Sequence, residues 1–115
     1  MQSWWLVMKD VTTPDQLSAA LNGPLTLLFK HSPRCPISVD SLEEVQAHLG
    51  SRQEGLLTIL DVVKDRALSQ DLERRSGIRH ESPQAILIRD GRIVWHASHF
   101  GITPAAIDRE LAAAP

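Results

Sequence analysis

Apolar side chains recur along the chain with two different periods, and these periods predict its secondary structure. Apolar runs or alternation predict five strands, at residues 4–8, 25–29, 56–60, 85–88 and 92–95. Apolar positions three and four apart predict helices over residues 36–49 and 65–75 and, more briefly, from residues 13 and 103 onward. The predicted order of elements is therefore βαβαβαββα.

The predicted ends of several elements depend on residues with special backbone preferences. Thr13 can cap a helix whose first residue is Pro14, and Asp65 can cap the helix that Gly77 ends. Residues 90–91 are Asp-Gly, which favours a type I′ turn and hence an antiparallel hairpin. A parallel first half followed by this hairpin is the order of the thioredoxin fold. We therefore expect an α/β, thioredoxin-like three-layer fold, with a mixed central sheet and helices on both faces.

Length, charge and hydropathy narrow the range of functions. The 115 residues contain no repeat or linker, so we expect a single domain over residues 1–115. A formal net charge of −2 with scattered Lys and Arg argues against nucleic acid as a partner. No apolar run is long enough to span a membrane and the N-terminus does not resemble a signal peptide. We expect a cytoplasmic monomer that binds neither nucleic acid nor membrane.

The single cysteine of the chain, Cys35, lies between a predicted strand and a predicted helix in the stretch HSPRCPIS. A thiol reacts as its thiolate, and the free N–H groups of a helix N-terminus favour negative charge. Pro36 suits the first helical position, Arg34 adds a cation, and Ser38 can offer its hydroxyl to the sulfur. An inert buried cysteine needs none of these neighbours, so we expect Cys35 to be ionised at neutral pH and catalytic.

Two features of the sequence indicate thiol–disulfide exchange. Residues 35–38 have the spacing of a C-x-x-C motif with Ser38 in place of the second cysteine. A protein with one thiol stops at a mixed disulfide and needs an external thiol to continue. Pro83 directly precedes a predicted strand, where thioredoxin-fold proteins carry a cis proline that faces the cysteine and holds extended substrate. We therefore expect a cis Ser82–Pro83 bond.

Three separated blocks of residues carry a resemblance to one family. The blocks are Lys30–Ser32 together with Cys35–Ser38, then His80–Gln84, then Val94–His99 together with Ile102–Thr103. In this order they resemble the monothiol bacilliredoxins of the bacillithiol system. The resemblance implies a thiol–disulfide oxidoreductase that removes bacillithiol from S-bacillithiolated proteins through a mixed disulfide at Cys35. It also implies modified proteins and a low-molecular-weight thiol as partners, with bacillithiol as co-substrate and no bound cofactor.

The chemistry of bacillithiol suggests which side chains contact it. Its malate carries two carboxylates, so the pocket should offer cations or N–H donors, and Arg34 is the first choice, with Lys30 and Arg79 beside it. The other candidate substrate-binding residues are His31, Pro36, Ser38, Ser82, Pro83 and His99. The pair His96 and His99 lies at a strand end, where positions three apart point to opposite faces, so we expect no metal site.

In dithiol thioredoxins a buried acid assists resolution at the position that Phe29 occupies here. Phe29 therefore suits a protein without a resolving thiol.

Two other functions remain open at this point. The C-x-x-S spacing is also similar to that of monothiol glutaredoxins, in which a dimer carries an iron–sulfur cluster with one cysteine per chain. Pro36 and Ile37 depart from the small glycine found there and argue against this function. The second alternative is a non-catalytic thioredoxin-fold binding module, in which the Pro83 loop holds extended peptides and Cys35 is incidental.

Overall fold

A computed structural model describes residues 9–113, and five strands within this range form one sheet. The strands are β1 (Lys9–Asp10), β2 (Leu25–His31), β3 (Leu57–Asp61), β4 (Gln84–Arg89) and β5 (Arg92–Ser98), in the order β1-β3-β2-β4-β5. Strands β1, β2 and β3 run parallel, whereas β4 is antiparallel to both β2 and β5. The predicted mixed sheet is thus confirmed. The strand predicted at residues 4–8 lies outside the described residues.

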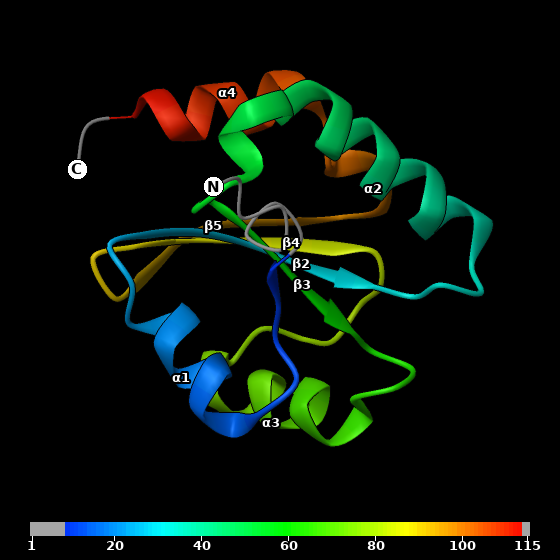
Figure 1. Ribbon diagram of the computed structural model, residues 1–115, viewed down its shortest axis with the longest axis vertical. Coiled ribbons are helices and arrows are strands. Elements are labelled where there is room, and N and C mark those ends of the chain that lie inside the picture. The colour runs from blue at the N-terminus through cyan, green and yellow to red at the C-terminus, as the bar shows by residue number, and fades with distance from the viewer. Residues whose placement is uncertain (1–8, 114–115) are drawn as a thin grey trace, which may run out of the picture.

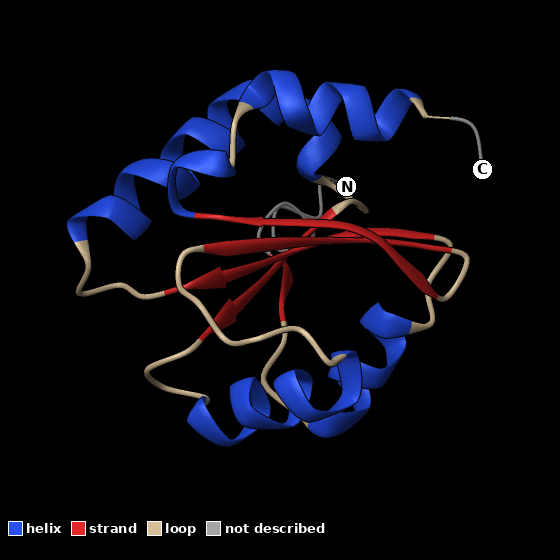
Figure 2. Cartoon of the chain, turned by 180° about the vertical axis from the view of Figure 1, so that it is seen from behind, coloured by secondary structure: helices blue, strands red, loops and turns tan. Residues whose placement is uncertain are grey.

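The helices cover both faces of the sheet. They are α1 (Pro14–Leu21), α2 (Pro36–Leu49), α3 (Arg66–Ser76) and α4 (Pro104–Ala112), with short 3-10 helices η2 (Gly50–Gln53) and η3 (His99–Gly101). Helices α2 and α4 lie on one face, and α1 and α3 lie on the other (Figures 1 and 2). This is the predicted three-layer thioredoxin fold. Among residues 9–113 no helix has the length and apolar character required to cross a membrane.

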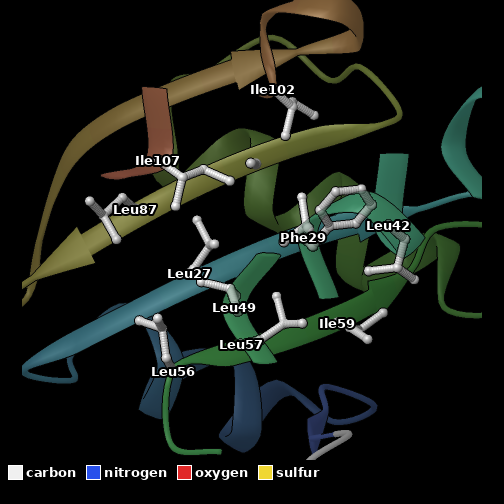
Figure 3. Packing of buried hydrophobic residues seen from close by; sticks show 12 residues of the cluster. Leu27, Phe29, Leu42, Leu49, Leu56, Leu57, Ile59, Leu87, Ile102 and Ile107 are labelled. Atoms are coloured by element: carbon white, nitrogen blue, oxygen red, sulfur yellow. The ribbon is translucent and has the colours of Figure 1, made fainter. Parts of the chain in front are cut away.

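Each face of the sheet has its own hydrophobic core. Figure 3 shows the cluster beneath α2 and α4, which includes Leu27 and Phe29 from β2. Leu28, the residue between them, belongs to the second cluster, beneath α1 and α3. Successive side chains of a strand point to opposite faces, so a strand buried on both faces is apolar at nearly every position. This explains the continuous apolar runs of the sequence.

Local sequence signals place most element ends correctly. Thr13 caps α1 in a capping box with Gln16, and Gly77 ends α3 in the left-handed region at φ 72°. Asp90 and Gly91 have φ of 53° and 75°, so the predicted hairpin turn is confirmed. Asp65 holds the cap position of α3 as predicted, but its side chain makes no capping hydrogen bond.

We predict that the protein needs both of its hydrophobic cores for stability. Leu27 and Leu28 are 1% and 0% exposed, so Leu27→Ala and Leu28→Ala each remove buried contacts and leave a cavity. Each substitution should lower the free energy of unfolding by about 2–5 kcal/mol in urea denaturation. Val94→Ala, at an exposed apolar position, is the control and should change this free energy by less than about 0.5 kcal/mol. A core variant as stable as the control would contradict the assignment.

Candidate functional site

The cysteine, the Pro83 loop and η3 lie at one edge of the sheet. In the register of the sheet, Lys30 of β2 pairs with Gln84 of β4, and Gln84 pairs with Ser98 of β5. The chain that follows β2, the chain that precedes β4 and the chain that follows β5 therefore leave the sheet together. Segments 32–35 and 79–83, together with His99, form the candidate active site.

Cys35 occupies the N-cap position of α2 with an extended backbone, and Pro36 is the first helical residue, as predicted. The turn before it is closed by a hydrogen bond from the Cys35 N–H to the Ser32 carbonyl (3.1 Å). Cys35 is half-buried, no side chain caps this helix, and its first turn contains no acidic residue. The free N–H groups of the first turn therefore favour negative charge near the sulfur.

Ser38 lies beneath the site, and the structure corrects its predicted role. Its side chain is 0% exposed, so it makes no direct contact with a substrate. Its Oγ accepts the Ser32 N–H (2.9 Å) and lies 2.8 Å from Nδ1 of His31. When neutral His31 carries its hydrogen on Nε2, Nδ1 accepts the only hydroxyl hydrogen, and none is left for Cys35. Ser38 is therefore a positioning residue for the turn and for His31.

His31, the last residue of β2, is half-buried beside this turn. Burial lowers the pKa of His31, and the nearby Asp61 carboxylate only partly opposes this effect. The lowered pKa favours the neutral ring, in which Nδ1 accepts the Ser38 hydroxyl hydrogen in one tautomer and donates to Ser38 in the other. Its bond to Ser38 holds His31 beside the turn that carries Cys35, and its contact with substrate stays a prediction.

The Pro83 loop supplies the second wall of the site. The Ser82–Pro83 bond is cis, which confirms the prediction, and the Pro83 ring is buried. The Pro83 carbonyl accepts the N–H of His99 (3.0 Å), which links this loop to η3. His99 itself is exposed and has a φ of 51°, a left-handed conformation in which histidine is enriched. Ser82 is half-buried, and its hydroxyl has no hydrogen-bond partner within residues 9–113.

The cations predicted near the site differ sharply in exposure. Arg34 is exposed in the turn before Cys35 and forms no hydrogen bond or ion pair with another described residue. Arg79 is also exposed. Lys30 is only 1% exposed, because its position on β2 directs it beneath α3, so it cannot contact a bound anion. Arg34 and Arg79 remain available for that role.

Lys30 and Gln84 form a buried polar pair that the sequence alone did not predict. The Lys30 Nζ donates to Oε1 of Gln84 (3.1 Å), and Nε2 of Gln84 donates to the Arg79 carbonyl (3.1 Å). Burial lowers the pKa of Lys30 to about 8, although the carboxylates of Glu73 and Glu81 oppose the shift. The pair ties the Pro83 loop to β2. A lysine inside an apolar strand run was the available signal, because a buried ammonium requires a partner.

The remaining contacts hold the loop from its outer side. The Ser98 hydroxyl donates to Glu81, and this bond is the main cause that lowers the pKa of the Glu81 carboxyl. The N–H of His80 donates to Glu73 of α3 (2.6 Å). Within residues 9–113 no group of three or more His, Cys, Asp or Glu side chains is arranged to hold a metal ion.

A half-buried lone cysteine at a helix N-terminus, at the same end of the sheet as a cis proline, is typical of a thiol oxidoreductase of the thioredoxin fold. A solved structure described as an oxidoreductase with a thioredoxin fold matches at 26% identity and a TM-score of 0.82, over 91% of this chain and 96% of that one. Thioredoxin from Trypanosoma brucei brucei matches at 13% identity and a TM-score of 0.75, over 96% and 93%. Mitochondrial thioredoxin 3 from Saccharomyces cerevisiae matches at 11% and 0.71, over 94% and 96%. The two thioredoxins show the fold alone.

Residues 9–107 match the family described as monothiol bacilliredoxin BrxC. The chain belongs to this family, which confirms the resemblance carried by its three sequence blocks. Family and fold together support a thiol redox role.

We predict that Lys30 makes stability depend on pH above neutrality. Its pKa of about 8 in the folded protein lies below the ordinary value of 10.5, so the unfolded chain binds more protons between these values. The free energy of unfolding should therefore rise as pH increases from about 8 to about 10.5, by at most about 3 kcal/mol. Urea denaturation across this range should show the rise in the wild-type protein and in Lys64→Met, an exposed control. Lys30→Met should lack it, and an equal rise in all three proteins would contradict the assignment.

Proposed function

We propose that the protein removes bacillithiol from S-bacillithiolated proteins, with bacillithiol as co-substrate and Cys35 as nucleophile. The observation that carries this proposal is a lone, half-buried cysteine at the N-terminus of α2, with a buried serine at the fourth position of its motif. Membership of the monothiol bacilliredoxin family supports the identity of the thiol.

The reaction consists of two exchange steps. The Cys35 thiolate attacks the bacillithiol sulfur of a protein mixed disulfide, and the bond between the two substrate sulfurs breaks. The electron pair leaves with the protein sulfur, which takes up a proton, and a Cys35–bacillithiol disulfide forms. The hydroxyl of Ser38 cannot displace bacillithiol from this disulfide. An external thiol must therefore attack the bound bacillithiol sulfur, which releases the Cys35 thiolate and forms a new disulfide.

The exposed parts of the site suit this substrate. Arg34 precedes Cys35 and is unpaired among the described residues, so its guanidinium can bind a malate carboxylate. The Pro83 carbonyl is occupied by the His99 N–H, which leaves the backbone of Ser82, before the cis bond, for the protein chain of the substrate. His99 lies next to the Pro83 loop, because its N–H donates to the Pro83 carbonyl.

The proposal predicts transfer of one bacillithiol to the protein. Reduced protein incubated with an S-bacillithiolated substrate should gain the mass of a single bacillithiol at Cys35 as the substrate loses it, because Ser38 cannot resolve the adduct. Intact-mass and peptide mass spectrometry measure both changes. The Cys35→Ser variant should gain no bacillithiol, and the substrate should lose bacillithiol no faster with this variant than without any protein. Loss at the same rate with this variant would refute the proposal.

Arg34 should matter for the charged adduct only. Arg34→Ala should lower kcat/KM for a bacillithiolated peptide by about fivefold, the loss expected when one exposed charge-assisted contact of about 1 kcal/mol is removed. An uncharged mixed disulfide of the same peptide should be used at the wild-type rate. Arg92→Ala serves as the control, because Arg92 is exposed at the opposite end of β5. Equal losses with both disulfides would place Arg34 outside the bacillithiol contact.

A further inference from the structure

A groove of about 260 Å³ adjoins the active site on the side of α2 that faces η3. Helix α2 contributes Ile37, Asp40 and Glu44, and the segment between β5 and α4 contributes Phe100 and Ile102. This volume lies below the roughly 300–1,000 Å³ of most small-molecule sites. It suits one or two side chains of a peptide better than a complete low-molecular-weight thiol.

The groove exposes apolar surface on both of its walls. Phe100 is 84% exposed and Ile37 is 44% exposed. Only four large hydrophobic side chains are exposed within residues 9–113, and two of them line this one groove. Single exposed apolar residues are normal, but a pair in one groove indicates a surface that a partner covers.

The negative charge of the groove indicates that its partner carries a basic residue. Asp40 and Glu44 are exposed, lie one turn apart on α2, and form no ion pair with another described residue. Among the described residues that line the groove, none is Lys or Arg, and one, His99, is a histidine. Two uncompensated carboxylates attract a cation and repel the malate carboxylates of bacillithiol. The groove therefore fits an apolar side chain next to Lys or Arg.

The groove continues from the reacting cysteine. Ile37 follows Cys35 by two residues, and η3 is joined to the Pro83 loop through the His99 N–H. A peptide whose modified cysteine reaches Cys35 can therefore place a neighbouring residue in the groove. We propose that this groove binds an apolar-basic segment beside the modified cysteine of the protein substrate and so selects among S-bacillithiolated proteins. The inference rests on the proposed function and adds a substrate preference to it.

Two bacillithiolated peptides test this preference, one with Leu-Arg beside the modified cysteine and one with Leu-Glu. The wild-type protein should show a kcat/KM about fivefold higher for the Leu-Arg peptide. Glu44→Lys should reverse this order, because it exchanges the sign of the charge in the groove. Phe100→Ser should lower kcat/KM for both peptides by about tenfold, chiefly through KM. Oxidised bacillithiol, which has no peptide, should transfer one bacillithiol to Cys35 of Phe100→Ser at the wild-type rate and release the other as the free thiol.

Two matched variants serve as controls. Glu43→Lys makes the same charge change on the neighbouring exposed residue of α2, which does not line the groove, and Val63→Ser removes an exposed apolar side chain elsewhere. Both should retain the wild-type preference. Equal use of the two peptides by the wild-type protein, or equal effects of Glu44→Lys and Glu43→Lys, would overturn the proposal. A loss confined to oxidised bacillithiol would also overturn it, by assigning the groove to the co-substrate.

A binding measurement separates this inference from the proposed function. Peptides with serine at the modified position cannot react, so their Kd reports on the groove alone. Glu44→Lys should weaken binding of the Leu-Arg peptide and strengthen binding of the Leu-Glu peptide. If no bacillithiol is transferred from any substrate, the proposed function fails, while this change in Kd still supports the groove. If transfer occurs and Kd does not change, only the groove is refuted.

Discussion

The pairing of β2 with β4 sets the geometry on which the rest of the molecule depends. Their last pair is Lys30 with Gln84, and the buried bond between these two side chains fixes the register at the end where the site lies. A slip of one residue would turn Phe29 out of the core beneath α2 and α4, because side chains alternate between the faces of a strand. It would also shift Pro83 along the sheet by about 3.3 Å relative to the turn that ends at Cys35. The register of β2 and β4 therefore positions both the hydrophobic core and the candidate active site.

The same packing explains why the chemistry uses a single thiol. Phe29 is fully buried in the core at the position where dithiol thioredoxins carry an acid, so no carboxylate lies there to assist a second step. The Ser38 hydroxyl is held by Ser32 and His31 and is closed to solvent. A dithiol protein uses these two positions for resolution. Here Phe29 packs in the core, and Ser38 supports the turn before Cys35. With neither a buried acid nor a second thiol at these positions, a thiol–disulfide exchange at Cys35 stops at a mixed disulfide until an external thiol reacts.

The sequence predicted the features that depend on local interactions and missed those that depend on distant contacts. Thr13, Gly77 and the Asp90 turn act through their own backbone preferences, so their positions could be predicted without a fold. Ser38 was expected to face the sulfur, because its spacing from Cys35 is local. Its actual partner, His31, is set by how α2 docks on the end of β2. The pairing of Lys30 with Gln84, 54 positions apart, likewise required the register of the sheet.

The candidate site is electrostatically divided, and this division bears on which sulfur is attacked. Arg34 provides an unpaired cation before Cys35, whereas Asp40 and Glu44 give the groove on α2 a negative charge. A bacillithiolated protein has an anionic thiol on one side of its disulfide and a peptide chain on the other. Displacement requires the attacking, central and leaving sulfurs to lie in line, so the orientation of the substrate decides which of its sulfurs receives Cys35. Under the proposed function and the proposed groove, the anionic half is drawn to Arg34 and the basic flank to the groove, which would make the bacillithiol sulfur the central one. Charge placement would then replace the missing second thiol in keeping the protein substrate from being trapped on Cys35.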